Sequence, residues 1–272
     1  AQRVVEAIVE VGTTTPGAVY TMDGTDIPPA PVAEIEDLPP GTSISGNDCN
    51  PPSNTGGTAP PGGVHGIATQ STDARDDLIA SAGASSAQIT GPSGSGDIQV
   101  PSIPPMSSQD MEEWVNTLLA QATLAGTGDC GTETGGPGDP KNFGTWDNPQ
   151  VCKVVGTGTE ALSDFITNGS SGAGILIIDD FDLITPPLEG STVTDFQYEG
   201  IVIVVGDGRF RMEGNSHIYG ALIQRNVTAN HSGETRLRLR GTSSICYSSL
   251  AVRRVQNTLT RGLMAWYEKA SN

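Results

Sequence analysis

The stretch that decides the fold runs from residue 172 to residue 251. It contains GAGILIIDDFDLIT (172–185), YEGIVIVVGDGRFRMEGNSHIYGALIQ (198–224) and LRLRGTSSICYSSLAV (237–252). Apolar runs recur at 175–178, 201–205, 221–223 and 250–252, and Gly174, Gly200 and Gly220 precede three of them. Alternating runs at 182–185, 209–213 and 236–240 lie between them, and Gly214 and Gly241, 27 residues apart, end two of these. A strand–turn–strand unit of this period predicts coiled, parallel β-strands, since each unit buries its apolar face only against its neighbours.

Composition supports a turn-rich β protein. The chain has 272 residues, with 35 glycines, 19 prolines and only 5% aromatic residues. That length allows a sizeable core, and the glycine and proline content indicates many turns and long loops. We therefore predict a mainly β fold with a few helices, a β-rich α+β protein whose strands stack as β-solenoid-like rungs.

The chain divides into four expected segments. Residues 1–20 hold the end of a short helix and a first strand, and residues 21–171 form a turn-rich insert. Residues 172–251 form the β-solenoid-like repeats, and residues 252–272 form a C-terminal helix and strand.

Two stretches have the apolar spacing of helices. Val4, Val5, Ile8 and Val11 share one stripe of residues 1–11, which is too short to be stable unless it packs on a partner. Residues 108–125 place apolar side chains at helical spacing, with acidic residues in the first turn, where the helix dipole favours them. A shorter helix is expected within 72–90, with Leu78 and Ile79 facing inward.

Charge is unevenly distributed. Residues 1–208 carry 28 acidic and 4 basic residues, whereas residues 209–272 carry 3 acidic and 10 basic residues. The acidic part suits solvation at a cell surface, and the basic part suits an acidic neighbouring subunit or a polyanion.

Four widely spaced cysteines indicate two disulfides and an oxidising compartment. Cys130 and Cys152 bracket one glycine-rich loop, so we favour that pair, which leaves Cys49 with Cys246. The alternative, buried free thiols, stays open.

Short motifs recur along the chain in a characteristic order. They are TPGAVY (15–20), ISGND (44–48), HGI (65–67), GILIID (174–179), GIVIVVG (200–206), GALI (220–223), ICYS (245–248) and AW (265–266). Each motif alone is weak, but their order resembles that of the PilX-type proteins of bacterial type IV pilus systems. The resemblance covers most of the chain.

The resemblance implies a membrane-anchored minor pilin or pilus assembly protein at the bacterial cell surface. Its partners would be other pilin or minor pilin subunits, and a hydrophobic N-terminal helix would attach it to the membrane. Residues 1–11, with Val4, Val5, Ile8 and Val11, would be the soluble end of that helix, and the hydrophobic part would precede Ala1. We therefore expect a non-enzymatic pilus-tip or assembly component that displays a rigid β surface for adhesion or subunit contact.

A carboxylate cluster is the first candidate site. Asp179, Asp180 and Asp182 follow one apolar run, and Asp207 follows the next. Oxygen ligands of this kind suit Ca²⁺. The spacing is not that of an EF-hand, so two interpretations stand: turn capping with solvation, or a Ca²⁺ site. No other cofactor is expected.

Alternating arginines are the second candidate site. Arg209 and Arg211 lie in one run, and Arg236, Arg238 and Arg240 lie in another. Alternation along a strand directs each set to one face. The stripe either pairs with carboxylates and solvent or binds a polyanion such as DNA.

No catalytic pattern is present in the sequence. His65, His217 and His231 lie in no metal-ligand or nucleophile motif, and Gly206 and Gly208 do not make a nucleotide-binding loop. A secreted β-helix protein that binds or degrades polysaccharide, including surface glycans, is the alternative function.

Overall fold

The computed structural model describes most of the predicted β regions. The described residues are 17–22, 33–56, 58, 62–69, 71–101, 118, 132–133, 140–155, 166, 168–179, 192–206, 209–226 and 235–255. The predicted assembly helix at 1–11 lies outside them. Of the predicted helix at 108–125, only Leu118 is described, and it is helical and buried.

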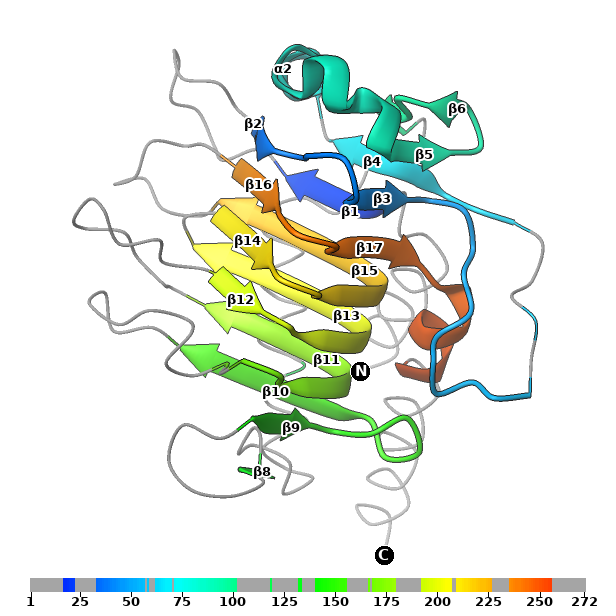
Figure 1. Cartoon of the computed structure of the whole chain (residues 1–272), viewed down its shortest axis with the longest axis vertical. Coiled ribbons are helices and arrows are strands. Elements are labelled where there is room, and N and C mark those ends of the chain that lie inside the picture. The colour runs from blue at the N-terminus through cyan, green and yellow to red at the C-terminus, as the bar shows by residue number, and fades with distance from the viewer. Residues whose placement is uncertain are drawn as a thin grey trace, which may run out of the picture.

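The chain is mainly β, and the strands among the described residues form two sheets (Figure 1). The larger sheet contains β1 (Gly17–Met22), β3 (Ser43–Ser45), β4 (His65–Thr69), β5 (Ile89–Gly91), β6 (Gly94–Ser95), β7 (Ile98–Gln99), β8 (Thr132–Glu133), β9 (Lys141–Phe143), β10 (Gln150–Val155), β11 (Ser171–Asp179), β13 (Gln197–Gly206), β15 (His217–Asn226) and β17 (Ser244–Tyr247). The smaller sheet contains β2 (Ala33–Asp37), β12 (Thr192–Thr194), β14 (Arg209–Glu213) and β16 (Thr235–Leu239). Apart from the pairs β5–β6 and β8–β9, the named strand pairs among the described residues are parallel.

The long strands β11, β13 and β15 pair so that like residues lie side by side. Ile175 aligns with Ile201, and Ile201 with Ala221. The runs 175–178 and 201–204 are buried on both faces, as continuous apolar strands of parallel sheets are. The apolar runs at 175–178, 201–205 and 221–223 therefore lie on neighbouring strands of one sheet.

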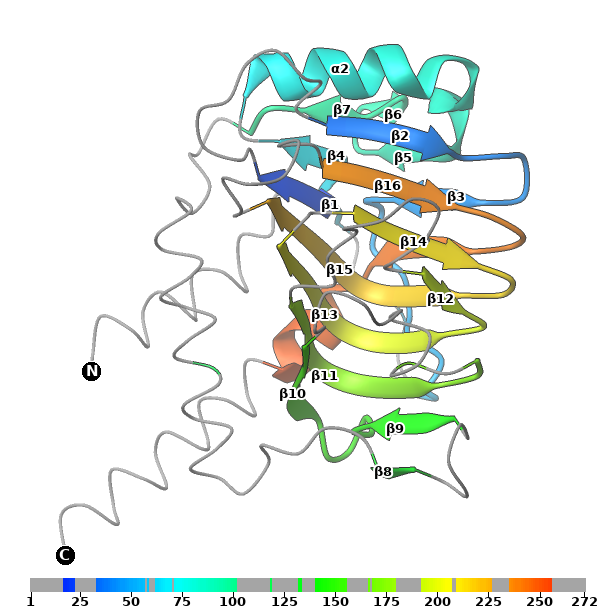
Figure 2. The ribbon, with the colours of Figure 1, turned by 90° about the vertical axis from the view of Figure 1, so that its left-hand side faces the viewer.

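A column of glycines explains why glycine precedes these runs. Gly174, Gly200 and Gly220 are in register, with φ angles of 128°, 150° and 147°. A Cβ at Gly220 would collide with the carbonyl oxygen of Gly200, and one at Gly200 with that of Gly174. The strands β11, β13 and β15 curve along their length (Figure 2), and at the glycine column only glycine combines the backbone conformation with so close an approach.

Short turns lead from the smaller sheet into the larger one. Gly41, Asp195, Gly214 and Gly241 occupy them with positive φ angles between 50° and 102°. Gly214 and Gly241 are the pair that the sequence places 27 residues apart, and they belong to successive turns.

Buried hydroxyl groups reinforce these turns. Ser216 Oγ donates to the carbonyl oxygen of Glu213 at 2.7 Å, and Ser243 Oγ to that of Arg240 at 2.7 Å. Thr42 Oγ1 donates to the carbonyl oxygen of Pro39 at the same distance. Because each hydroxyl bonds a carbonyl three residues earlier, the turns are closed without leaving the buried oxygens unpaired.

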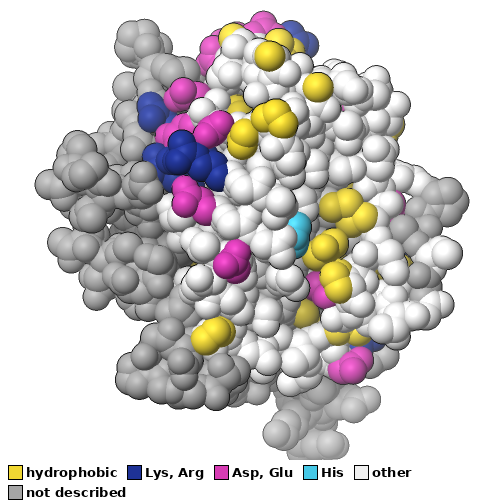
Figure 3. Space-filling view, viewed as in Figure 1, with side chains coloured by type: hydrophobic (Ala, Val, Ile, Leu, Met, Phe, Trp, Pro, Cys, Tyr) yellow, Lys and Arg dark blue, Asp and Glu magenta, His cyan; other side chains and the backbone are white. Residues whose placement is uncertain are grey.

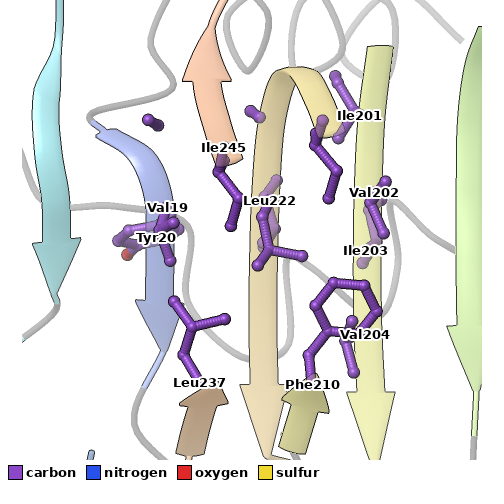
Figure 4. Close-up of a cluster of buried hydrophobic side chains, with 14 of the residues drawn as sticks. Val19, Tyr20, Ile201, Val202, Ile203, Val204, Phe210, Leu222, Leu237 and Ile245 are labelled. Atoms are coloured by element: carbon purple, nitrogen blue, oxygen red, sulfur yellow. The ribbon is translucent and has the colours of Figure 1, made fainter. Parts of the chain in front are cut away.

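The core lies between the two sheets. Phe210 and Leu237 of the smaller sheet lie beside Leu222 and Val204 of the larger one (Figure 4), and all four side chains are buried. Phe196 and Tyr198 stack with ring centroids 5.7 Å apart. Burial of such side chains is the main favourable term that holds the sheets together.

Strands from the N-terminal part of the chain pair with strands from its C-terminal part. β1 pairs with β15, β2 with β16 and β3 with β17. The Cys49–Cys246 disulfide, which joins residues 197 apart, fixes the same closure.

Helix α2 (Thr72–Ala82) lies over one end of the larger sheet (Figure 1). Ser71 caps it and a short 3₁₀-helix (Gly83–Gln88) follows it. Leu78 is buried as expected, but the prediction for Ile79 was wrong, since Ile79 is 48% exposed. Residues 249–255 are helical, with Val252 and Val255 buried, which agrees with the helix expected at the start of the C-terminal segment.

Candidate functional site

The predicted arginine stripe lies on the outer face of the smaller sheet. Parallel pairing of β14 with β16 aligns Arg209 with Arg236 and Arg211 with Arg238. Arg240 follows β16 directly. Figure 3 shows basic side chains gathered in one cluster with acidic side chains around it. The backbone of Arg209 lies in β14, but its side chain is outside the described part.

The four described arginines contact acidic partners. Arg211 Nε donates to Glu36 Oε2 at 3.1 Å and Nη2 donates to Oε1 at 3.3 Å. Arg236 lies 3.2 Å from Glu34 Oε2 and 3.5 Å from Glu36 Oε1.

Arg238 and Arg240 have acidic partners as well. Arg238 lies 3.6 Å from Glu213, and its side chain is only 9% exposed. Arg240 Nε donates to Asp37 Oδ2 at 2.8 Å on a more exposed part of the face. We name the set Arg211, Arg236, Arg238, Arg240, Glu34, Glu36, Asp37 and Glu213 the ion-pair face.

Three of the acidic partners come from β2, which sequence reasoning did not connect to the arginines. The signal was present, because AEIED (33–37) alternates acidic and apolar residues as TRLRL (235–239) alternates basic and apolar ones. Opposite charges on adjacent strands favour such pairing. The arrangement agrees with the carboxylate-pairing interpretation and leaves little positive charge uncompensated for a polyanion.

The predicted calcium cluster lies mostly outside the described residues. Asp179 ends β11, where it aligns with Val205, but its side chain is not described. Asp180, Asp182 and Asp207 fall in undescribed segments. Within the described ranges, no group of three or more His, Cys, Asp or Glu side chains could hold a metal ion. The Ca²⁺ site stays a prediction.

One of the two predicted disulfides is confirmed. Cys49 bonds Cys246, tying the loop after β3 to β17. Cys152 is buried on β10, and Cys130 lies outside the described residues. The Cys130–Cys152 pair therefore stays a prediction.

A polar network around His217 was not predicted. His217 Nδ1 lies 2.7 Å from Ser244 Oγ, and Nε2 lies 2.9 Å from Asn215 Oδ1, which also accepts from Thr242 Oγ1 at 2.9 Å. Since Asn215 Oδ1 only accepts, Nε2 carries the ring proton and Nδ1 accepts from Ser244. His217 and Ser244 are in register on adjacent strands, so the network is a cross-strand polar ladder.

Burial perturbs two groups in this region. Partial burial lowers the pKa of His217 below its usual 6.5, which favours the neutral ring. Partial burial, and next the carboxylate of Glu199, raise the pKa of Tyr219. The rings of His217 and Tyr219 lie 6.0 Å apart.

His65 of the HGI segment also contacts a carboxylate. Its Nδ1 lies 3.1 Å from Oδ1 of Asp97, whose side chain is fully buried. Gly91 has no room for a Cβ because the Asp97 carboxylate occupies that space. The pair joins β4 to the segment before β7 and was not predicted from the sequence.

A polar hollow lies between two loops near the helical residues 249–255. Its volume is about 550 Å³, and Ser53, Asn54, Thr55, Gly56, Thr145, Trp146 and Asp147 line it. Arg254 stacks on the Trp146 ring at 5.7 Å and donates to its carbonyl oxygen at 2.9 Å. No sequence motif marks this site, because its two sides lie about 90 residues apart.

Comparison with known proteins adds no assignment. No family model, no curated protein and no solved structure matches the chain. In the part of the chain that the structure describes, no helix has both the length and the apolar character needed to cross a membrane.

Proposed function

We propose that the chain is a non-enzymatic minor pilin, a pilus-tip or assembly component of a type IV pilus system. It would act outside the bacterial cell by presenting a rigid β surface for adhesion or for contact with neighbouring subunits. The observation that carries the proposal is the ordered series of motifs shared with PilX-type proteins. The disulfide is consistent with a non-reducing environment of this kind.

The positions of the motifs support their treatment as a set. HGI lies on β4, AVY on β1, GALI on β15, GIVIVVG on β13 and GILIID on β11, and these strands pair in that order. ICYS lies on β17, and ISGND begins on β3, its neighbour. Segments scattered over the sequence thus meet in one sheet, which is what a common fold requires. The AW pair at 265–266 lies outside the described residues.

The finer architecture that we propose is a coil of β-solenoid-like rungs. Each rung would pass through the smaller sheet, a glycine-containing turn and a long strand of the larger sheet. The parallel, in-register pairing of β12, β14 and β16 alongside β13, β15 and β17 supports this arrangement. Neighbouring rungs would stabilise one another and give a stiff surface.

The test is incorporation into filaments in a piliated host that expresses the protein. Replacing Val4 and Ile8 by Asp places charge on the apolar stripe and should remove the protein from sheared pili, because the stripe would pack against other subunits. Glu6→Gln is the matched control and should leave recovery unchanged. Recovery of the Val4→Asp/Ile8→Asp protein at the wild-type level, or absence of the wild-type protein from pili, would count against the proposal.

A further inference from the structure

The hollow beside Trp146 has the size and fixed walls of a small-molecule site. Its volume of about 550 Å³ falls within the range of about 300–1,000 Å³ that is usual for ligand pockets. One wall is formed by residues 53–56 and the other by residues 145–147. Loops that are held in place before binding lose little entropy when a ligand arrives.

Arg254 holds the wall that contains Trp146. Its Nε donates to the Trp146 carbonyl oxygen at 2.9 Å, and its guanidinium lies 5.7 Å from the indole centroid. Its Nη2 also lies 3.3 Å from Asp147 Oδ1. A cation stacked on an indole ring restrains the ring, so Trp146 is positioned where it lines the hollow.

Three kinds of contact hold the opposite wall. Asn50 Nδ2 donates to the Asn54 carbonyl oxygen at 3.0 Å, and Asn54 Nδ2 donates to Asn50 Oδ1 at 2.6 Å. The Ser53 amide donates to Glu199 Oε1 at 3.1 Å. The Cys49–Cys246 disulfide ties the start of this loop to β17.

The lining is polar, with one aromatic ring. Ser53, Thr55 and Thr145 offer hydroxyls, Asn54 an amide and Asp147 a carboxylate whose side chain is 93% exposed. None of the residues that line the hollow is cationic, and Arg254 pairs with the Asp147 carboxylate, so the lining offers little net charge to a charged ligand. Apart from the indole, the described lining holds no large apolar side chain that would favour a hydrophobic peptide.

We infer that this hollow binds a neutral saccharide unit. The apolar face of a sugar ring packs on an indole, while its hydroxyls exchange hydrogen bonds with side-chain hydroxyls, amides and carboxylates. This combination matches the residues that line the hollow. The inference is independent of the pilus proposal, because it concerns a ligand of the isolated chain and requires no filament.

The experiment is a titration of the ¹⁵N-labelled chain with free oligosaccharides, followed through the tryptophan indole N–H signals. One arm uses oligomers of glucose, mannose and galactose, and the other uses oligomers of N-acetylglucosamine. The chain has three tryptophans, and Trp146→Phe identifies the Trp146 signal. We expect that signal to shift saturably in one arm, with a dissociation constant in the millimolar range, and the preferred arm distinguishes plain from N-acetylated glycans.

Variants test whether the shift arises in the hollow. Trp146→Ala lacks the reporting indole, so its binding is followed through the backbone amide signals of residues 53–56; it should weaken binding by about tenfold or more, because the stacking surface is lost. Ser53→Ala combined with Thr55→Val removes two exposed hydroxyls and should weaken binding severalfold without lowering the melting temperature. Ile79→Ser, on exposed α2, is the control and should bind as the wild type does.

Two outcomes would overturn the inference. One is a Trp146 signal that does not shift with either set of oligosaccharides. The other is unchanged affinity in the Ser53→Ala/Thr55→Val protein with its melting temperature preserved. Incorporation into pili is not measured in this titration, so failure here leaves the pilus proposal standing, and failure of the filament test leaves this one standing.

Discussion

Three glycines that no other residue can replace fix the path of the backbone in the larger sheet. At Gly174, Gly200 and Gly220, a left-handed or strongly extended φ coincides with a carbonyl oxygen of the neighbouring strand where a Cβ would lie. Any side chain there must displace backbone that is itself hydrogen-bonded in the sheet. The backbone path of the three long strands at this column therefore requires glycine, because a Cβ has no room there.

Gly220→Ala should lower the free energy of unfolding by about 3 kcal/mol or more, because strain and overpacking act together. Chemical denaturation of the purified variant measures this. Gly56→Ala is the matched control, since nothing lies within 4 Å of a Cβ built there, and it should change stability little. Equal effects of the two substitutions would contradict the role of the glycine column.

His217 should make stability depend on pH. Its pKa is lowered in the folded chain from 6.5 by burial, so below about pH 6.5 the unfolded state binds more protons at this residue. The contribution of neutral His217 to the free energy of unfolding is therefore fully present above pH 6.5, and it is lost as the pH falls toward the pKa of the folded state. The melting temperature of the wild type should therefore fall more steeply between about pH 7 and pH 5.5 than that of His217→Gln. Parallel curves for the two proteins would show that His217 does not contribute.

At the scale of elements, charge and apolar alternation together determine how β2 joins the smaller sheet. Ile35 is buried while Glu34 and Glu36 reach Arg236 and Arg211 on the outer face. A shift of one residue would exchange these two faces. The arginines that the sequence offers as a polyanion surface thus serve first to hold β2 in register.

Removing the acidic partners should expose the positive charge. The triple variant Glu34→Gln/Glu36→Gln/Asp37→Asn leaves the described arginines of the ion-pair face with far less acidic compensation. We expect it to retain DNA at low salt, with affinity falling by about tenfold or more at high salt, whereas the wild type retains little. Filter binding across a salt series measures the difference.

The control for that experiment changes net charge equally but elsewhere. Asp73→Asn/Asp76→Asn/Asp77→Asn on α2 also removes three negative charges. If this variant gains the same DNA retention, net charge rather than the ion-pair face is responsible.

At the scale of the whole molecule, the two ends of the described chain close on each other. β1, β2 and β3 pair with β15, β16 and β17, and the disulfide joins two residues that are 197 positions apart. Bringing together segments so far apart in the sequence costs more chain entropy than closing a local turn does. The closure therefore depends on contacts that form only when both segments are in place.

Replacing both Cys49 and Cys246 by Ser should lower the free energy of unfolding by up to about 5 kcal/mol, on a chain-entropy estimate for a loop of this length. Denaturation under non-reducing conditions compares the double variant with the wild type. Adding a reductant should destabilise the wild type more than the variant. A variant as stable as the oxidised wild type would show that strand pairing alone closes the chain.

Much of the architecture could be predicted locally. The strands at 17–22, 171–179, 197–206 and 217–226 coincide with segments that the sequence marks as a first strand or as apolar runs. The mainly β class and the Cys49–Cys246 bridge also agree with expectation. Ile79 was misassigned because helical spacing does not specify which face a neighbouring element covers.

The sequence by itself determined the strands and turns, because apolar runs and the glycines beside them act within a few residues of each other. Only the tertiary structure decided which strands meet. Three features each join segments far apart in the chain: the pairing of β2 with β16, the hydrogen-bond network around His217, and the hollow between residues 53–56 and 145–147. Such contacts depend on register and packing across the whole fold, so a pattern within one segment, such as the alternation in AEIED, does not by itself select the partner.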